Sequence, residues 1–374
     1  MNILGICLSA GKGGLELYAH KAISALNQAG HTCHFAVSPK SYLRQREWAM
    51  PVLEIKPVFR LFPLLTAIKL ARYIDARQID ILHMHWSKDL NLAALSKLLS
   101  RRKPKLVYSR HMEITRSKKD RYHRMLYRQV DKMLTIAKFV QEQAIKFLPL
   151  TAEQVSLLYL GVQATERASP QTCSRLLHGI GDSENAFVIG MIGRIEPYKG
   201  QHVLIEALAI LKPQHLNLQV AMAGPVMDKS YFESLNRRIR EQGLSDNVSY
   251  FGISQEPAKL MSCCHVVVLT TMCETFGLVL VEAMRAGTAV IGTNAGGVPE
   301  IIKHQETGLL FASGDAQQLA DSLAELCRDK PMRERLARAG KAYADAMFDE
   351  TQHFVSLEYI LTTLVATLSV SEIQ

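Results

Sequence analysis

Short apolar runs alternate along this chain with segments whose apolar residues recur at helical spacing. Residues 266–270, for example, are almost wholly apolar and β-branched, which is typical of a strand buried on both faces. Such runs separated by helical patterns indicate parallel βαβ units. The chain is therefore predicted to be an α/β protein with doubly wound parallel sheets. Strands are expected near 2–8, 32–37, 80–85, 105–110, 132–136, 155–159, 186–192, 217–223, 247–251, 265–270, 288–292 and 308–311.

Helices are expected between these strands, and the length of the chain indicates more than one domain. The first helix, from about Gly14 to Ala29, ends before Gly30, as is common at helix C-termini. Because 374 residues exceed the usual size of a single core, two domains are expected. Later helices are expected to begin near 200, 228, 254, 276, 315, 330 and 350. The predicted parts are a first domain at 1–165, a linker at 166–184 rich in Ser, Thr, Gly and Pro, a second domain at 185–350 and a C-terminal helix at 351–374.

Two glutamates, Glu274 and Glu282, lie eight residues apart just after the strand expected at 265–270. Open α/β sheets bind ligands at the carboxyl ends of their strands, so Glu274 is expected at a ligand site. Glu282 falls within an apolar helical segment, where an unpaired carboxylate is costly and hydroxyl groups of a ligand would satisfy it. The alternative is that Glu274 caps the helix and Glu282 bonds a neighbouring amide or base.

Two further strand ends carry groups suited to an anion. Arg194 and Lys199 lie in a turn after the strand at 186–192, and cations there suit a phosphate or diphosphate. Gly296 and Gly297 follow the strand at 288–292, where glycine allows close backbone approach to a ligand. Pro299 suits the first turn of a short helix whose free amides favour negative charge. The three strand ends are expected to converge on one site.

In their order and separations, the motifs Gly-Arg-x(4)-Lys-Gly, Glu-x(7)-Glu and Gly-Gly-Val-Pro-Glu resemble those of the retaining GT-B glycosyltransferases of family 4, also called glycosyl transferases group 1. The resemblance covers almost the whole chain and is sharpest from about Gly190 to Glu300. It implies two Rossmann-like domains facing each other across a cleft, with the last helix crossing back onto the first domain. The implied reaction is transfer of a hexosyl unit from a nucleotide diphosphosugar with retained configuration.

The resemblance also implies roles for individual residues. Arg194 and Lys199 would bind the donor diphosphate, Glu274 the sugar hydroxyls and Glu282 the ribose. His111, at the end of the strand near 105–110, would contact the donor sugar. The expected catalytic residues are His111, Arg194, Lys199 and Glu274. The expected donor-binding residues are Gly13, Gly14, Arg194, Lys199, Ile253, Glu274, Thr275, Phe276, Gly277, Leu278 and Glu282, and the expected acceptor-binding residues are Glu16, His85 and Arg110.

The glycine-rich loop that precedes the first helix, from Gly11 to Glu16, departs from the G-x-G-x-x-G fingerprint because its sixth position is glutamate. Its Gly13 and Gly14 can still bring backbone amides to a donor phosphate. The alternative interpretation is a plain tight turn.

Neither a cofactor nor a metal ion is expected. His83 and His85 share one strand face and could in principle hold a metal, but the sequence offers no clear third ligand. We expect one of them to line the acceptor pocket and the other to form a hydrogen bond within the domain. The sequence also lacks Asp-x-Asp at a strand end, which holds the metal in the other glycosyltransferase fold. The co-substrate is expected to be a UDP-sugar, with GDP- and ADP-sugars as alternatives.

Charge is uneven along the chain. Residues 1–180 contain 28 Lys and Arg against 12 Asp and Glu, whereas 181–374 contain 16 against 23. Most of the excess lies between Arg101 and Lys146, and the part from Arg116 to Arg128 carries aromatics among its cations. Such a run suits anionic lipid head groups at the inner membrane surface or a phosphorylated acceptor. The same run could also bind nucleic acid, although such a partner is not expected. The alternative is that the run is simply the solvated face of a helix.

The sequence predicts a cytoplasmic protein, peripheral at the inner face of the plasma membrane. No run approaches 18 apolar residues, and the first residues lack the basic region and cleavage site of a signal peptide. Seven cysteines, at 7, 33, 173, 263, 264, 273 and 327, have no ligand-like spacing and are expected to be reduced core thiols.

The acceptor suggested by these features is a saccharide, glycolipid or phosphorylated saccharide, as in the synthesis of a lipopolysaccharide core or another surface glycan. Two other classes stay open at this stage. One is a nucleotide-sugar epimerase or hydrolase on the same fold, and the other is a non-enzymic protein that binds membranes or nucleic acid through the basic run.

Overall fold

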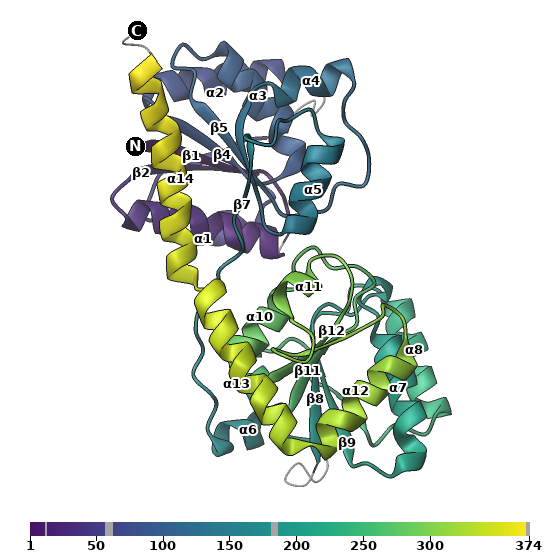
Figure 1. Cartoon of the computed structure of the whole chain (residues 1–374). Helices are drawn as coiled ribbons and strands as arrows, with labels where there is room; N and C mark the ends of the chain where they lie inside the picture. Colours follow the sequence, from purple (N-terminus) through teal and green to yellow (C-terminus); the bar gives the residue numbers. More distant parts are fainter. Residues whose placement is uncertain (12, 57–62, 181–185, 372–374) are drawn as a thin grey trace. The chain divides into compact units, whose positions relative to one another are not determined.

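The computed structural model describes residues 1–11, 13–56, 63–180 and 186–371, and of 367–371 the backbone alone (Figure 1). Lys12 of the glycine-rich loop and residues 181–184 of the expected linker lie outside the described residues. The chain forms two compact units, one comprising Met1–Tyr159 with Thr351–Gln374 and the other Leu160–Glu350.

The first unit is built on a seven-stranded, wholly parallel sheet of order β3-β2-β1-β4-β5-β6-β7. The six strands expected in this half are present, and a seventh, β3, was not expected. β3 is a three-residue edge strand, too short to show a period in the sequence. The strands are β1 (Asn2–Cys7), β2 (Thr32–Val37), β3 (Val52–Glu54), β4 (Ile81–Met84), β5 (Lys105–Arg110), β6 (Val130–Thr135) and β7 (Val155–Leu157).

Helices cover both faces of this sheet because successive strand residues point to opposite sides. Ile3 packs in a core with α1 and the C-terminal helix α14, whereas Leu4 packs in a core with α2 and α3. Leu357 and Leu361 of α14 are wholly buried, and Figure 1 shows α14 beside α1. The helices of the unit are α1 (Gly14–Gln28), α2 (Leu64–Ala76), α3 (Leu90–Leu99), α4 (Arg121–Tyr127), α5 (Lys138–Phe147) and α14 (Glu350–Ser371), with 3-10 turns at Tyr42–Gln45 and Ser87–Asp89.

The second unit has a six-stranded parallel sheet of order β10-β9-β8-β11-β12-β13, with every expected strand present. Its strands are β8 (Phe187–Ile192), β9 (Leu218–Ala223), β10 (Val248–Tyr250), β11 (Val266–Leu269), β12 (Ala289–Thr293) and β13 (Leu309–Phe311). Its helices are α6 (Pro170–Leu176), α7 (Gln201–Leu211), α8 (Lys229–Glu241), α9 (Pro257–Ser262), α10 (Leu278–Arg285), α11 (Val298–Ile301), α12 (Ala316–Arg328) and α13 (Lys330–Met347), with 3-10 turns at Pro197–Lys199 and Lys212–Gln214. The prediction of two doubly wound Rossmann-like folds is confirmed.

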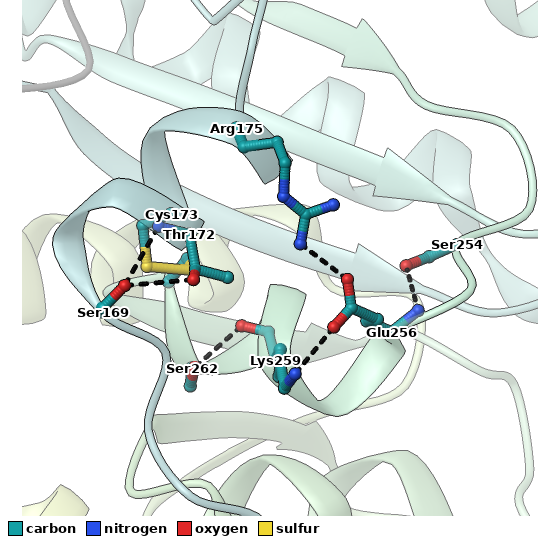
Figure 2. A network of polar contacts seen from close by, with 9 residues as sticks. Ser169, Thr172, Cys173, Arg175, Ser254, Glu256, Lys259 and Ser262 are labelled. Atoms are coloured by element: carbon teal, nitrogen blue, oxygen red, sulfur yellow. Dashed lines mark hydrogen bonds and ion pairs between the residues drawn. A yellow bond between two sulfur atoms is a disulfide. The ribbon is translucent and has the colours of Figure 1, made fainter.

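Helix α6 lies within the segment expected to be a linker, and it is tied to α9. Figure 2 shows the disulfide that Cys173 of α6 forms; its partner is Cys263, which directly follows α9. Beside it, Glu256 accepts hydrogen bonds from Arg175 at 2.6 Å and Lys259 at 2.7 Å. The expectation that all seven cysteines are reduced is wrong for this pair. The two residues lie 90 positions apart, so no sequence spacing could relate them.

In each sheet the chain reverses its direction of winding between two neighbouring strands. In the first unit β4 returns beside β1, and in the second β11 returns beside β8. The loops that follow these four strands therefore lie at the topological switch points, where open α/β sheets bind ligands. No helix in the described parts of the chain is long and apolar enough to cross a membrane.

Candidate active site

Lys199 and Glu274 form an ion pair at the switch point of the second unit. The Lys199 Nζ lies 2.6 Å from Oε2 of Glu274, and the two side chains are 19% and 20% exposed. The Thr271 hydroxyl donates to the same oxygen at 3.4 Å. From the sequence both charged groups were expected to face a ligand, whereas the structure joins them to each other. Partial burial makes this pair a stronger interaction than one at the open surface.

The loops after β8 and β11 are locked together behind this ion pair. The Thr270 hydroxyl donates to the backbone oxygen of Lys199 at 2.8 Å. Gly200 has φ +68°, and a Cβ there would lie 2.2 Å from the Thr270 oxygen. Only glycine fits both this conformation and this contact, so the two loops act as one rigid support for Lys199.

The glycine turn after β12 supports Glu274 in the same way. The backbone N–H of Gly297 donates to the backbone oxygen of Glu274 at 2.8 Å. A Cβ at Gly296, whose φ is +61°, would lie 2.1 Å from the same backbone oxygen. The close backbone approach expected here for a ligand is thus made to Glu274 itself. The short helix expected at Pro299 is confirmed as α11.

Arg194 lies at the surface of the loop after β8. Its side chain is 55% exposed, and its Nη2 is 3.0 Å from Oε1 of Glu196. The side-chain amide of Gln201, the first residue of α7, donates to the Arg194 backbone oxygen at 2.8 Å. The loop is therefore fixed while the guanidinium extends toward solvent.

Among the residues expected to bind the donor, some side chains are buried and others are exposed to solvent. Phe276 is 2% exposed and packs edge-on against Phe348, with 5.6 Å between ring centroids, so only its backbone can serve a ligand. Gly277, with φ +105°, precedes α10, which begins two residues later than expected. The side chains of Glu274, Thr275, Leu278 and Glu282 are partly exposed, and Ile253, on the loop after β10, is 65% exposed.

In the first unit the carboxylate of Glu16 belongs to the glycine-rich loop. Glu16 is 5% exposed; its Oε1 accepts from the Ser9 hydroxyl and its Oε2 accepts from Gly13 N–H at 2.8 Å. A glutamate in the first turn of a helix commonly bonds back to the preceding amide in this way. The loop conformation thus depends on Glu16, and the acceptor contact expected of Glu16 stays a prediction.

Arg110 likewise serves its own loop. It is 8% exposed and donates to the backbone oxygens of Met112 at 2.7 Å and Glu113 at 2.6 Å, and to the Tyr108 hydroxyl at 2.7 Å. These bonds hold the turn that contains His111. Arg110 thus positions that turn, and its expected contact with an acceptor stays a prediction.

His111 belongs to a cluster of histidines around Tyr18, in which His83 and His85 are buried and His111 is partly exposed. His83 donates to or accepts from the Ser109 hydroxyl at 2.8 Å, while both ring nitrogens of His85 are buried and lack a hydrogen-bond partner in the described structure. Burial lowers the pKa of His83 and of His111 to about 3 and holds the pKa of His85 well below its ordinary value, so all three rings are neutral near pH 7. His85 is 1% exposed, and its expected place in an acceptor pocket stays a prediction.

Some of these contacts come from residues that the sequence analysis did not select. Thr270 is the last residue of the strand predicted at 265–270 and Thr271 follows it, so their position was a usable signal. Tyr18 and His353 had none, because their contact joins residues 335 positions apart. Among the described residues, no group of three or more His, Cys, Asp or Glu side chains is arranged to hold a metal ion.

Comparison with known families adds a second line of evidence. A family model described as Glycosyltransferase Family 4 matches residues 12–166, and one described as Glycosyl transferases group 1 matches residues 178–343. The two matches together take in most of the chain.

Individual relatives match over different lengths. The D-inositol 3-phosphate glycosyltransferase of Paenarthrobacter aurescens is 31% identical over 189 residues, which are 50% of this chain and 46% of the relative. This chain thus spans about half the length of that curated relative. The N-acetyl-alpha-D-glucosaminyl L-malate synthase of Bacillus anthracis is 23% identical over 356 residues, covering 90% of this chain and 91% of the relative.

Among solved structures, Anabaena HepE in complex with UDP and glucose superposes with a TM-score of 0.82 at 26% identity, covering 96% of this chain and 99% of HepE. The lipopolysaccharide outer core galactosyltransferase WaaB, in its apo form, has a TM-score of 0.76 at 16% identity and covers 96% of this chain and 99% of that one. This second match shows the fold alone.

Proposed function

This chain belongs to glycosyltransferase family 4, and we propose that it moves a hexosyl unit from a nucleotide diphosphosugar to a saccharide or glycolipid acceptor with retention of configuration. A UDP-sugar is the favoured donor, since HepE, at 26% identity, is a complex with UDP and glucose. The observation that carries the proposal is the Lys199–Glu274 pair at the switch point of the second unit.

In this proposal Lys199 and Glu274 bind different parts of the donor. Arg194 and Lys199 contact the diphosphate and stabilise the negative charge that grows on it as it leaves. Glu274 accepts hydrogen bonds from hydroxyls of the sugar, and Glu282 accepts them from the ribose. The backbone of residues 275–278, before and at the start of α10, lies near the diphosphate, where a helix N-terminus favours negative charge.

The proposed reaction needs neither a metal ion nor a covalent enzyme intermediate. The oxygen of an acceptor hydroxyl attacks the anomeric carbon from the face that the diphosphate leaves. The bond between the anomeric carbon and the diphosphate oxygen breaks, and the proton of the acceptor hydroxyl passes to the departing diphosphate. A glycosyl–enzyme adduct trapped on this chain would overturn the scheme.

The acceptor is proposed to be lipid-linked or phosphorylated, in the synthesis of a lipopolysaccharide core or another surface glycan at the inner membrane face. The first unit supports this with exposed cations around α4 (Figure 1) and with Met112 and Met125, which are 56% and 42% exposed. Cations beside exposed apolar side chains suit a lipid interface. The exposed cations are Arg116, Lys119, Arg121, Arg124 and Arg128.

A thermal-shift panel of UDP, GDP, ADP and their sugars tests the donor. A ligand at about a hundred times its dissociation constant stabilises the protein by roughly 2.7 kcal/mol. We expect the largest shift with UDP or a UDP-sugar and a smaller one in Glu282→Ala. If none of these compounds raises the melting temperature, the transferase proposal fails. Turnover that is unchanged by EDTA and sedimentation with anionic but not neutral vesicles test the metal and membrane parts separately.

A further inference from the structure

Tyr18 and His353 form a partly buried hydrogen bond between α1 and the C-terminal helix α14. His353 is 5% exposed, and its Nδ1 lies 2.6 Å from the backbone oxygen of Tyr159. A carbonyl oxygen only accepts, so Nδ1 carries the proton. In the neutral ring Nε2 is then an acceptor, and the Tyr18 hydroxyl, 3.0 Å away, donates to it. Both directions hold for the neutral form of the His353 ring.

The other side of the Tyr18 ring packs against His111. The two ring centroids are 4.6 Å apart, with 58° between the planes, and His85 lies 5.7 Å from the same ring. His111 Nε2 is buried and has no hydrogen-bond partner in the described part of the chain. Arg110 fixes the backbone of the turn, but the orientation of the His111 ring depends on its packing partners.

We propose that Tyr18 and His353 are positioning residues for His111. The His353–Tyr18 hydrogen bond holds the Tyr18 ring in the place where it limits rotation of the His111 imidazole. The His353 ring is oriented in turn by its hydrogen bond to the backbone oxygen of Tyr159. Tyr159 is the last residue of the first unit before the chain enters the second. This inference rests on the proposed function and on the expectation from the sequence that His111 contacts the donor sugar.

The first unit contains a matched control. Tyr73 and His34 form a similar pair, with 2.8 Å between the Tyr73 oxygen and His34 Nδ1, and His34 is also 5% exposed. This pair joins α2 to β2, and in the described structure its hydrogen bond and ring contacts involve Tyr73, His34 and Arg77. Tyr73→Phe thus removes the same kind of bond as Tyr18→Phe, at comparable burial, without altering the surroundings of His111.

The test combines three measurements on the full-length protein. Imidazole ¹⁵N spectra report the surroundings of His111, calorimetry with UDP reports donor affinity, and turnover of UDP-glucose reports the reaction. We expect Tyr18→Phe to shift the His111 resonances and to lower turnover roughly five- to tenfold, as loss of about one hydrogen bond would, with UDP affinity unchanged. Tyr73→Phe should leave all three unchanged. His353→Gln, whose amide oxygen can accept from Tyr18, should recover part of the turnover that His353→Leu loses.

Two results would overturn the inference. One is that Tyr18→Phe moves the His111 resonances no more than Tyr73→Phe does. The other is that Tyr18→Phe and Tyr73→Phe reduce turnover equally, in proportion to their loss of thermal stability. If wild-type protein binds none of UDP, GDP, ADP and their sugars, the proposed function fails instead, while the imidazole spectra still decide whether Tyr18 orients His111.

Discussion

Lys199 and Glu274 neutralise each other across 2.6 Å at the end of the second sheet, each held by a loop that has little freedom to move. When a ligand binds, this ion pair can break, and each of its two side chains can then bind a different group of the ligand. A diphosphate attracts the ammonium, and sugar hydroxyls donate to the carboxylate. The pair can thus exchange its internal contact for two contacts with one donor.

Substituting the two members of this pair separates their roles. Lys199→Met should weaken UDP binding by about 10- to 100-fold, because a hydrogen bond to a charged group contributes about 1.5–3 kcal/mol. Glu274→Gln should leave UDP affinity equal or slightly higher, since Lys199 is no longer held, and should lower turnover of UDP-glucose. Calorimetry with UDP and initial-rate kinetics measure the two effects. Equal losses of UDP affinity in both variants would contradict the assignment.

The assignment of Glu282 to the ribose predicts a dependence on the hydroxyls of the ligand. Glu282→Gln should weaken UDP binding by about tenfold, for the loss of a charged hydrogen bond. The same substitution should have little effect on binding of a UDP analogue that lacks both ribose hydroxyls. A double-mutant cycle between residue and ligand measures this coupling, and a coupling energy near zero would remove Glu282 from the ribose site.

The disulfide between Cys173 and Cys263 is expected to stabilise the second unit. Cys173→Ser should lower its free energy of unfolding by about 2–4 kcal/mol in non-reducing buffer, because the cross-link restricts the unfolded chain. With a reducing agent present, the variant and the wild type should become nearly equal. Urea unfolding in both buffers measures the difference, and Cys327→Ser, which removes a free thiol, is the control. Free-thiol titration that finds seven reactive groups in unfolded, non-reduced protein would exclude the bond.

The buried histidines predict an acid-sensitive first unit. Burial lowers the pKa of His83 to about 3, below the ordinary value near 6.5, so the unfolded chain binds a proton more readily than the folded one. The contribution of His83 is therefore fully present above about pH 6.5 and is lost as pH falls from there toward 3, by up to about 1.4 kcal/mol per pH unit. Hydrogen exchange of β4 amides at several pH values measures this slope, which should be shallower in His83→Gln. An identical slope in the variant would assign the effect to other groups.

Arg285 predicts a stability effect without a direct role in donor binding. It is 4% exposed and donates to the backbone oxygens of Val162 and Phe348 and, at 3.0 Å, to Asp349. Arg285→Met would leave these acceptors with fewer partners and should cost about 2–4 kcal/mol of unfolding free energy. Arg335→Met, at an exposed position with one hydrogen bond, should cost well under that. Urea unfolding of both variants tests the contrast.

Much of the fold was accessible from the sequence, since parallel strands buried on both faces appear as apolar runs and the turns between them carry glycine and proline. All twelve predicted strands are present, and the short helix expected at Pro299 was found. The three-residue strand β3 and helix α6 escaped detection. Their stability comes from neighbours distant in the sequence: β2 pairs with β3, and the disulfide to Cys263 joins α6 to α9.

The sequence by itself determined which polar residues gather at the strand ends, because alternating strands and helices bring the loops after parallel strands to one edge of each sheet. Only the tertiary structure decided what those residues contact. Lys199 pairs with Glu274, Glu16 bonds its own glycine-rich loop, Arg110 bonds the turn of His111, and His85 is enclosed in the protein interior. The reason is physical: a strand or helix follows from local periodicity, whereas a buried charge or imidazole takes the nearest partner that the folded chain provides, whatever its distance in sequence.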